Sequence, residues 1–138
     1  MSGTQQPKHV RMLRIVSLGI AMLLAASMAS SATLAEIDVA AAAVQIQEKQ
    51  TKVLDVREPA EFSTGVIQGA MLIPLGQVEK RVAELDAYKD QPLIVVCATG
   101  GRSAQAIKTL SKYGFTQLQN LKGGMTAWRR AQMPVVAP

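Results

Sequence analysis

The sequence has very little of two side chains that carry much enzyme chemistry. It holds one histidine, His9, and one cysteine, Cys97, among 138 residues. Because His9 lies in a segment that we expect to be removed, the sequence excludes a cysteine-histidine pair of the thiol-protease type. It also excludes a histidine general base and a zinc site built from cysteine and histidine. A single cysteine forms no internal disulfide and has no second thiol to resolve an intermediate on its sulfur, so any such intermediate needs an outside acceptor.

The chain also lacks a strong excess of charge once its first 35 residues are set aside. The formal net charge is +5 overall, but from Glu36 onward there are 12 Lys or Arg and 10 Asp or Glu residues, which leaves about +2. Nucleic-acid-binding domains are usually far more basic, with Lys and Arg gathered on one face. We therefore expect no nucleic-acid partner.

The first 35 residues have the order of an export leader. Basic residues precede an apolar stretch over residues 15–29, and small residues follow over residues 30–35. This order is typical of a signal peptide. We expect residues 1–35 to be a cleaved signal peptide and residues 36–138 to be the mature domain. The preferred cleavage point follows Ala35, and the alternatives follow Ala32 and Ala29.

An uncleaved membrane anchor is the competing interpretation of the leader. Residues 15–35 approach the length of about 20 residues that a membrane span needs. Their last third is rich in Ser, Ala and Thr, however, and is too weakly apolar for a span. The sequence favours a periplasmic protein that contacts the membrane only through its leader during export. The alternative is a membrane-anchored protein that faces the periplasm.

The mature segment alternates between strand and helix patterns. Apolar runs predict strands at Ile37 and over residues 52–57, 71–74, 93–96 and 117–121. Alanine content and helical spacing predict helices over residues 39–48, 75–85 and 104–113, and a short last helix after Gly123 and Gly124. This alternation predicts a single α/β domain, with a mostly parallel sheet and helices on both faces. Ligands of such sheets bind beyond the carboxyl ends of the strands.

Cys97 stands at one of those carboxyl ends. The residues after it can turn their amides toward its sulfur, while the next helix points its N-terminus at the same place. Such donors lower a cysteine pKa from about 8.5 toward neutrality and supply a nucleophilic thiolate. A lone cysteine at a strand end is also a common inert core residue. The candidate loop consists of Cys97, Ala98, Thr99, Gly100, Gly101, Arg102 and Ser103.

Two further groups of charged residues lie near predicted strand ends. Asp55 and Arg57 follow an apolar strand and form either a structural ion pair or part of the pocket rim. Glu58 and Glu61 form either a solvated face or a pair at the start of a helix. For Trp128, packing under the last helix is favoured over a binding role, because large aromatic side chains mainly supply buried area.

Five segments, taken in order, resemble the marks of the rhodanese domain. They cover residues 54–62, 65–70, 73–75, 97–103 and 123–128. The resemblance implies a central five-stranded parallel sheet and a persulfide formed on Cys97. It also implies that the amides of residues 98–103 cradle the outer sulfur and that Arg102 holds the anionic part of the donor. Thiosulfate would then be the donor, cyanide, a thiol or a protein the acceptor, and no cofactor or metal would be needed.

The departures from the rhodanese pattern are small. Val66 and Gln68 stand where the family often has His and Pro, but the cysteine that inactive modules lack is present. Four residues separate Cys97 from Arg102, whereas the related thiol phosphatases use a longer loop to wrap phosphate. Mercaptopyruvate-type enzymes have a less basic loop. The sequence therefore predicts a thiosulfate sulfurtransferase. A persulfide carrier or sensor that serves a protein partner is the alternative, and a phosphatase or arsenate-reductase-like enzyme is less favoured.

Overall fold

The computed structural model describes residues 33–138. The predicted signal peptide lies outside the described residues except for its last three, Thr33, Leu34 and Ala35. Residues 33–138 form a compact unit that is built on one sheet. All five strands pair in parallel in the order β1-β5-β4-β2-β3, as the α/β prediction requires. The strands are β1 Glu36–Ile37, β2 Lys52–Asp55, β3 Met71–Leu72, β4 Leu93–Val96 and β5 Leu118–Leu121.

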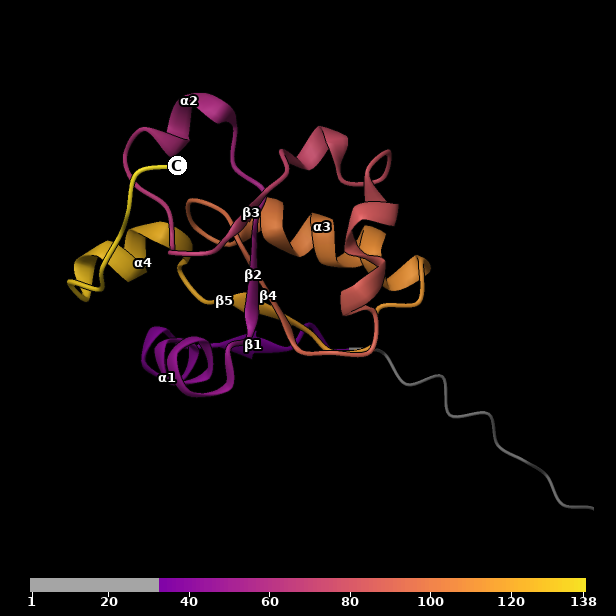
Figure 1. The fold of residues 1–138 in the computed structure, drawn as a ribbon, viewed down its shortest axis with the longest axis horizontal. Helices are drawn as coiled ribbons and strands as arrows, with labels where there is room; N and C mark the ends of the chain where they lie inside the picture. Colours follow the sequence, from indigo (N-terminus) through magenta and orange to yellow (C-terminus); the bar gives the residue numbers. More distant parts are fainter. Residues whose placement is uncertain (1–32) are drawn as a thin grey trace, which may run out of the picture. The chain divides into compact units, whose positions relative to one another are not determined.

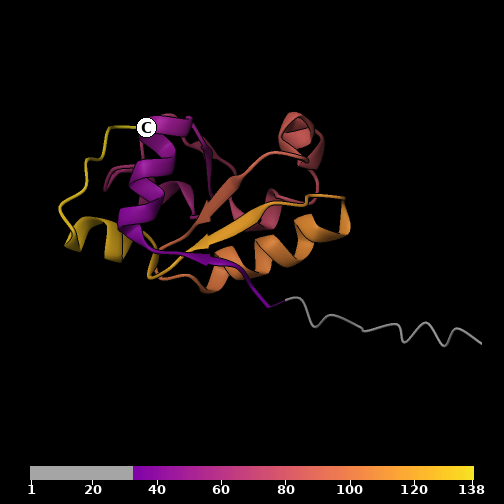
Figure 2. The same ribbon diagram turned by 90° about the horizontal axis from the view of Figure 1, so that it is seen from below.

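Helices cover both faces of this sheet (Figure 1). The α-helices are α1 Val39–Lys49, α2 Pro59–Phe62, α3 Gly101–Lys112 and α4 Gly124–Arg130, and the 3₁₀ segments are η1 Leu75–Gln77 and η2 Val82–Tyr88. Side chains of α1 and α4 pack on one face, and those of α3, η1 and η2 pack on the other. Figure 2 shows the strands between α1 and α3. No helix within residues 33–138 combines the length and apolarity that a membrane crossing needs.

The sequence dictates the central strand and the first helix in a direct way. All four residues of β4 are buried, which is why this strand is apolar throughout instead of alternating. Asp38 precedes α1 in an extended conformation, and its Oδ1 accepts a hydrogen bond from the amide of Ala41 at 2.8 Å. A side-chain acceptor at this position satisfies an amide that the helix leaves free. Asp38 is therefore the N-cap of α1.

One predicted element differs in kind. Residues 75–85 were expected to form an amphipathic α-helix, but they form η1, a turn and the start of η2. The apolar positions of the pattern still face inward, since Val78 and Leu85 are buried. The amide of Val78 bonds the carbonyl of Leu75, three residues earlier, as in a 3₁₀ helix. Pro74 fixes the entry to η1, and Gly76 within it is a poor α-helix former.

The sheet register brings three strand ends together. Asp55 of β2 pairs with Val96 of β4, and the amide of Val56 then donates to the carbonyl of Val96 at 2.9 Å. On the other side, Val95 of β4 pairs with Asn120 of β5. Because all strands are parallel, the residues after β2, β4 and β5 emerge at one edge of the sheet. Cys97 is the first residue after β4, at the centre of this edge.

Candidate active site around Cys97

The Cys97 loop is fixed from below by the start of α4. The amide of Met125 donates to the carbonyl oxygen of Cys97 at 2.8 Å, and the amide of Thr126 donates to that of Ala98 at 3.0 Å. This close approach depends on Gly124, which has a φ of +57°. A Cβ there would lie 2.6 Å from the carbonyl carbon of Ala98. The Gly123-Gly124 turn thus allows the start of α4 to pack against the Cys97 loop and hold its backbone in place.

The sulfur of Cys97 lies inside the loop that follows it. The Cys97 residue is 1% exposed. The amide of Gly100 donates to Sγ at 3.1 Å, and the hydroxyl of Ser103 lies 3.4 Å from it. Gly100 can aim its amide inward because its φ of +111° is open to glycine and costly for other residues. Gly100 and Ser103 therefore place hydrogen-bonding groups against the sulfur from two positions of the loop.

Two opposing effects act on the pKa of Cys97. Burial of the sulfur raises it, because a thiolate loses hydration in the interior. The Ser103 hydroxyl and the amides of Ser103, Gly100 and Thr99 lower it, because they donate to the charged form. The donors prevail, and the pKa of the Cys97 thiol lies below its ordinary value. The loop is built for a thiolate, which is the nucleophilic form of cysteine.

Asn120 of β5 also supports the loop, and the sequence analysis did not identify this residue. Its side chain is 2% exposed; Oδ1 accepts from the Ser103 hydroxyl at 2.5 Å, and Nδ2 donates to the carbonyl of Gly100 at 3.1 Å. Both bonded residues contact the Cys97 sulfur. The available signal was an asparagine, a weak strand former, at a buried strand position.

Arg102 does not stand free above the sulfur. Its Nη1 and Nη2 bond the two carboxylate oxygens of Glu61 at 2.7 and 2.8 Å. The hydrogen bond from Arg102 is the main reason that the pKa of Glu61 falls to about 2. The hydrogen bond to Glu61 raises the pKa of Arg102 above its ordinary value, and the charge of a Cys97 thiolate adds a smaller effect in the same direction.

Glu61 also has the helix-start role that the sequence left open. Its Oε2 accepts from the amide of Glu58 at 2.9 Å, and the amide of Glu61 bonds the carbonyl of Glu58 at 2.9 Å. Both bonds belong to the first turn of α2. The contact with Arg102 was not expected, because it joins residues 41 positions apart in the sequence.

Asp55 and Arg57 have the geometry of a structural ion pair and not of a pocket rim. Arg57 Nη2 lies 2.7 Å from Asp55 Oδ2, and both side chains are almost fully buried. The other guanidinium hydrogens point to Asp55 again, to the carbonyls of Glu61 and Gly65, and to Oγ1 of Thr64. All five guanidinium hydrogens thereby have partners, and none is left for a ligand. The pair instead ties the α2 region to the end of β2.

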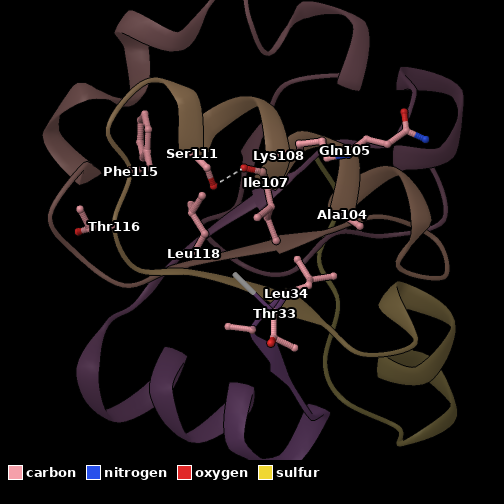
Figure 3. A pocket seen from close by; sticks show the side chains of 11 residues that line it. Thr33, Leu34, Ala104, Gln105, Ile107, Lys108, Ser111, Phe115, Thr116 and Leu118 are labelled. Carbon is pink, nitrogen blue, oxygen red and sulfur yellow. Dashed lines mark hydrogen bonds between the residues drawn. The ribbon is translucent and has the colours of Figure 1, made fainter. Parts of the chain in front are cut away.

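A separate cavity lies away from Cys97. It measures about 610 Å³ and runs along α3 and β5, where Leu34, Ile107, Phe115 and Leu118 line it (Figure 3). Cys97 does not line it, and among the residues that the structure describes Lys108 is the one charged residue on its wall. Within residues 33–138, no three His, Cys, Asp or Glu side chains gather in a way that could hold a metal ion.

Trp128 is a core residue, as the sequence favoured. It is 3% exposed and packs with the α1 and α4 side chains. Its indole Nε1 donates to the carbonyl of Pro134 at 2.9 Å, which satisfies the one polar atom of the ring. A binding role is not needed to explain it.

Comparisons with known proteins agree with this geometry. The chain matches the family described as Rhodanese-like domain over residues 38–131. A protein named sulfurtransferase from Allochromatium vinosum is 38% identical over 85 residues, which are 62% of this chain and 78% of the relative. The thiosulfate sulfurtransferase GlpE of Vibrio cholerae is 32% identical over 101 residues, which are 73% and 93% of the two chains.

A solved structure gives the same result. The crystal structure of a rhodanese-related protein from Thermoplasma volcanium superimposes with a TM-score of 0.68 and 34% identity, over 75% of this chain and 99% of that one. The five motifs, the parallel sheet and these comparisons lead to one conclusion: the chain belongs to the rhodanese-like domain family.

Proposed function

We propose that the protein is a sulfurtransferase that carries sulfur as a persulfide on Cys97. The observation that supports this most is the inward ring of donors around one sulfur, with the amide of Gly100 at 3.1 Å. Such a ring stabilises a thiolate before the reaction and a charged terminal sulfur during it. Relatives named sulfurtransferase support the same class of reaction.

The proposed cycle has two displacement steps. The thiolate of Cys97 attacks the outer sulfur of thiosulfate, a new S–S bond forms, and sulfite leaves with the electron pair of the broken S–S bond. Cyanide then attacks the terminal sulfur of the persulfide, thiocyanate leaves, and the Cys97 thiolate returns. A thiol or a protein thiolate can take the place of cyanide as acceptor. This is covalent catalysis with an activated nucleophile, and it uses no cofactor.

Steady-state kinetics tests the proposal. We expect thiosulfate and cyanide to give a saturable rate of thiocyanate formation, and we expect C97S to lose that rate while its circular dichroism stays unchanged. Activity retained in C97S would refute the mechanism. Persulfide exchange with protein acceptors alone would favour the carrier function. Hydrolysis of an aryl phosphate that disappears in C97S would favour a phosphatase.

We further propose that the protein is exported to the periplasm. The support is the leader pattern of residues 1–35. The carbonyl of Ala35 accepts from the amide of Asn120 at 2.8 Å, so cleavage after Ala32 or Ala29 would keep a sheet bond that cleavage after Ala35 would remove. Expression in a Gram-negative host, followed by fractionation and mass measurement, tests both points. An uncut chain in the membrane fraction would favour the anchored alternative.

A further inference from the structure

Glu61 occupies the hydrogen-bonding edge of the arginine that the family resemblance assigns to the donor anion. Both Arg102 Nη atoms bond its carboxylate at 2.7 and 2.8 Å. A bidentate pair of this kind uses the same fork that would bind a sulfonate. We propose that Glu61 is a specificity residue, which makes a strongly anionic donor compete for Arg102 and so favours sulfane-sulfur donors of low charge. This inference rests on the proposed sulfur transfer at Cys97.

The position of Glu61 is built into the fold and is not a chance surface contact. The Arg57 guanidinium, itself buried against Asp55, donates from Nη1 to the carbonyl of Glu61 at 3.2 Å. The amide of Glu58 holds the carboxylate from a second side at 2.9 Å. These bonds fix both the backbone and the side chain of Glu61, so little side-chain entropy remains to be lost when it meets Arg102.

The charges around the sulfur show why the pair matters for donor choice. Arg102 and Glu61 together are neutral, and the Cys97 thiolate adds one negative charge. A thiosulfate dianion that reaches for Arg102 must break two charge-assisted hydrogen bonds and approach an extra carboxylate. A persulfide of a thiol carries less charge and needs no cation for its carrier group, so it does not face this competition.

Alkylation of Cys97 tests the inference without any sulfur transfer. Iodoacetate is an anionic probe and iodoacetamide is its neutral analogue, and both react with the thiolate. The quantity to compare is the rate constant for iodoacetate divided by the rate constant for iodoacetamide. This ratio cancels any change in the fraction of Cys97 that is thiolate, and it reports how strongly the charges around the sulfur attract or repel an anionic reagent. In E61Q, which keeps an oxygen for the amide of Glu58, we expect this ratio to rise about fivefold, equal to about 1 kcal/mol at 1.4 kcal/mol per factor of ten.

Two matched variants control for the loss of a charge. Glu84 forms the same kind of pair with Arg81, at 2.6 Å, but does not touch the Cys97 loop. Glu58 is an exposed carboxylate next to α2 that is not bonded to Arg102. We expect E84Q to leave the ratio unchanged and E58Q to raise it by less than half as much as E61Q. Equal effects in E58Q and E61Q would mean a general field and would overturn the role of the pair.

Kinetics with thiosulfate then separates this inference from the proposed function. In E61Q we expect the KM for thiosulfate to fall about fivefold with kcat nearly constant, since only donor binding changes. An unchanged alkylation ratio in E61Q overturns the specificity role even if sulfur transfer is active. Absence of thiosulfate turnover in every variant counts against the proposed function, while the alkylation ratio still decides the role of Glu61. If E61Q does not fold, E61D, whose shorter side chain cannot keep both bonds, should raise the ratio in the same direction.

Discussion

The Ser103 hydroxyl is the part of the Cys97 site that a single atom change can test. Its oxygen lies 3.4 Å from Cys97 Sγ and 2.5 Å from Asn120 Oδ1, but a hydroxyl has one proton to donate. With a neutral thiol, that proton goes to Asn120. Once the thiolate forms, the proton can turn to the sulfur, and the bond to Asn120 is given up.

The size of the effect follows from these two bonds. A hydrogen bond to a charged group is worth about 1.5–3 kcal/mol, and the neutral bond released at Asn120 is worth about 1 kcal/mol. Ser103 therefore favours the thiolate by about 0.5–2 kcal/mol net. Since one pH unit corresponds to about 1.4 kcal/mol, S103A should raise the pKa of Cys97 by about one pH unit.

Asn120→Leu should act in the opposite direction. Without the Asn120 acceptor, the Ser103 proton is free for the sulfur from the start, and the pKa of Cys97 should fall by somewhat less than one pH unit. The carbonyl of Gly100 loses its bond from Asn120 but keeps the helix bond from the amide of Ala104 at 3.2 Å. The loop thus retains a backbone anchor in this variant.

The rate of iodoacetamide alkylation, followed against pH, measures both shifts through its midpoint. Opposite shifts in S103A and N120L support the shared-proton account. Shifts of the same sign, or an unchanged midpoint in S103A, would refute it. S103A should also lose about 1–3 kcal/mol of stability, because Asn120 Oδ1 stays buried without a donor.

Three further predictions concern the supports of the loop. Replacing Arg57 by Ala leaves the Asp55 carboxylate buried without a partner, so chemical denaturation should show a loss of about 3–5 kcal/mol, and a loss below about 1 kcal/mol would contradict the structural role. Gly124→Ala places a methyl group against the Cys97 carbonyl, so the folded variant should show at least a tenfold slower alkylation by iodoacetamide; wild-type rates would contradict the close packing. The pKa of Glu61 is lowered to about 2, so its ion pair contributes to stability above about pH 4.5 and loses that contribution as the pH falls toward 2. Because both side chains of the pair are about one-third exposed, screening limits this contribution to about 1 kcal/mol, and E61Q should flatten the acid side of the stability curve by that amount; an unchanged curve would contradict it.

The sheet and the candidate loop at Cys97 could be predicted from sequence because their signals are local. The run over residues 93–96 is apolar throughout, as expected for a strand that is buried on both faces. The glycines after Cys97 indicate a tight loop. The order of helix and strand patterns then leaves few topologies for a chain of this length. The pattern of residues 75–85 identified the inward face but not the helix type, because 3₁₀ and α spacing place similar positions inward over so short a stretch.

The parts of the site that could not be predicted from the sequence depend on contacts between residues far apart in the chain. Glu61 and Arg102 are 41 positions apart, and Ser103 and Asn120 are 17 apart. Neither pair has a local pattern, because a carboxylate at a helix start and an asparagine in a strand each have an ordinary local explanation. The role of Arg57 could not be decided for the same reason. Its partners come from β2, α2 and the turn at Gly65, and only the fold brings them together.

The central claim is that Cys97 carries the transferred sulfur, and intact mass tests it most directly. The protein should gain the mass of one sulfur atom after incubation with thiosulfate and lose it again after cyanide is added. C97S should gain nothing. A wild-type protein that gains no sulfur, although its thiol is free and reacts with iodoacetamide, would contradict the claim that thiosulfate loads Cys97. A gain that persists in C97S would contradict the assignment of the nucleophile itself.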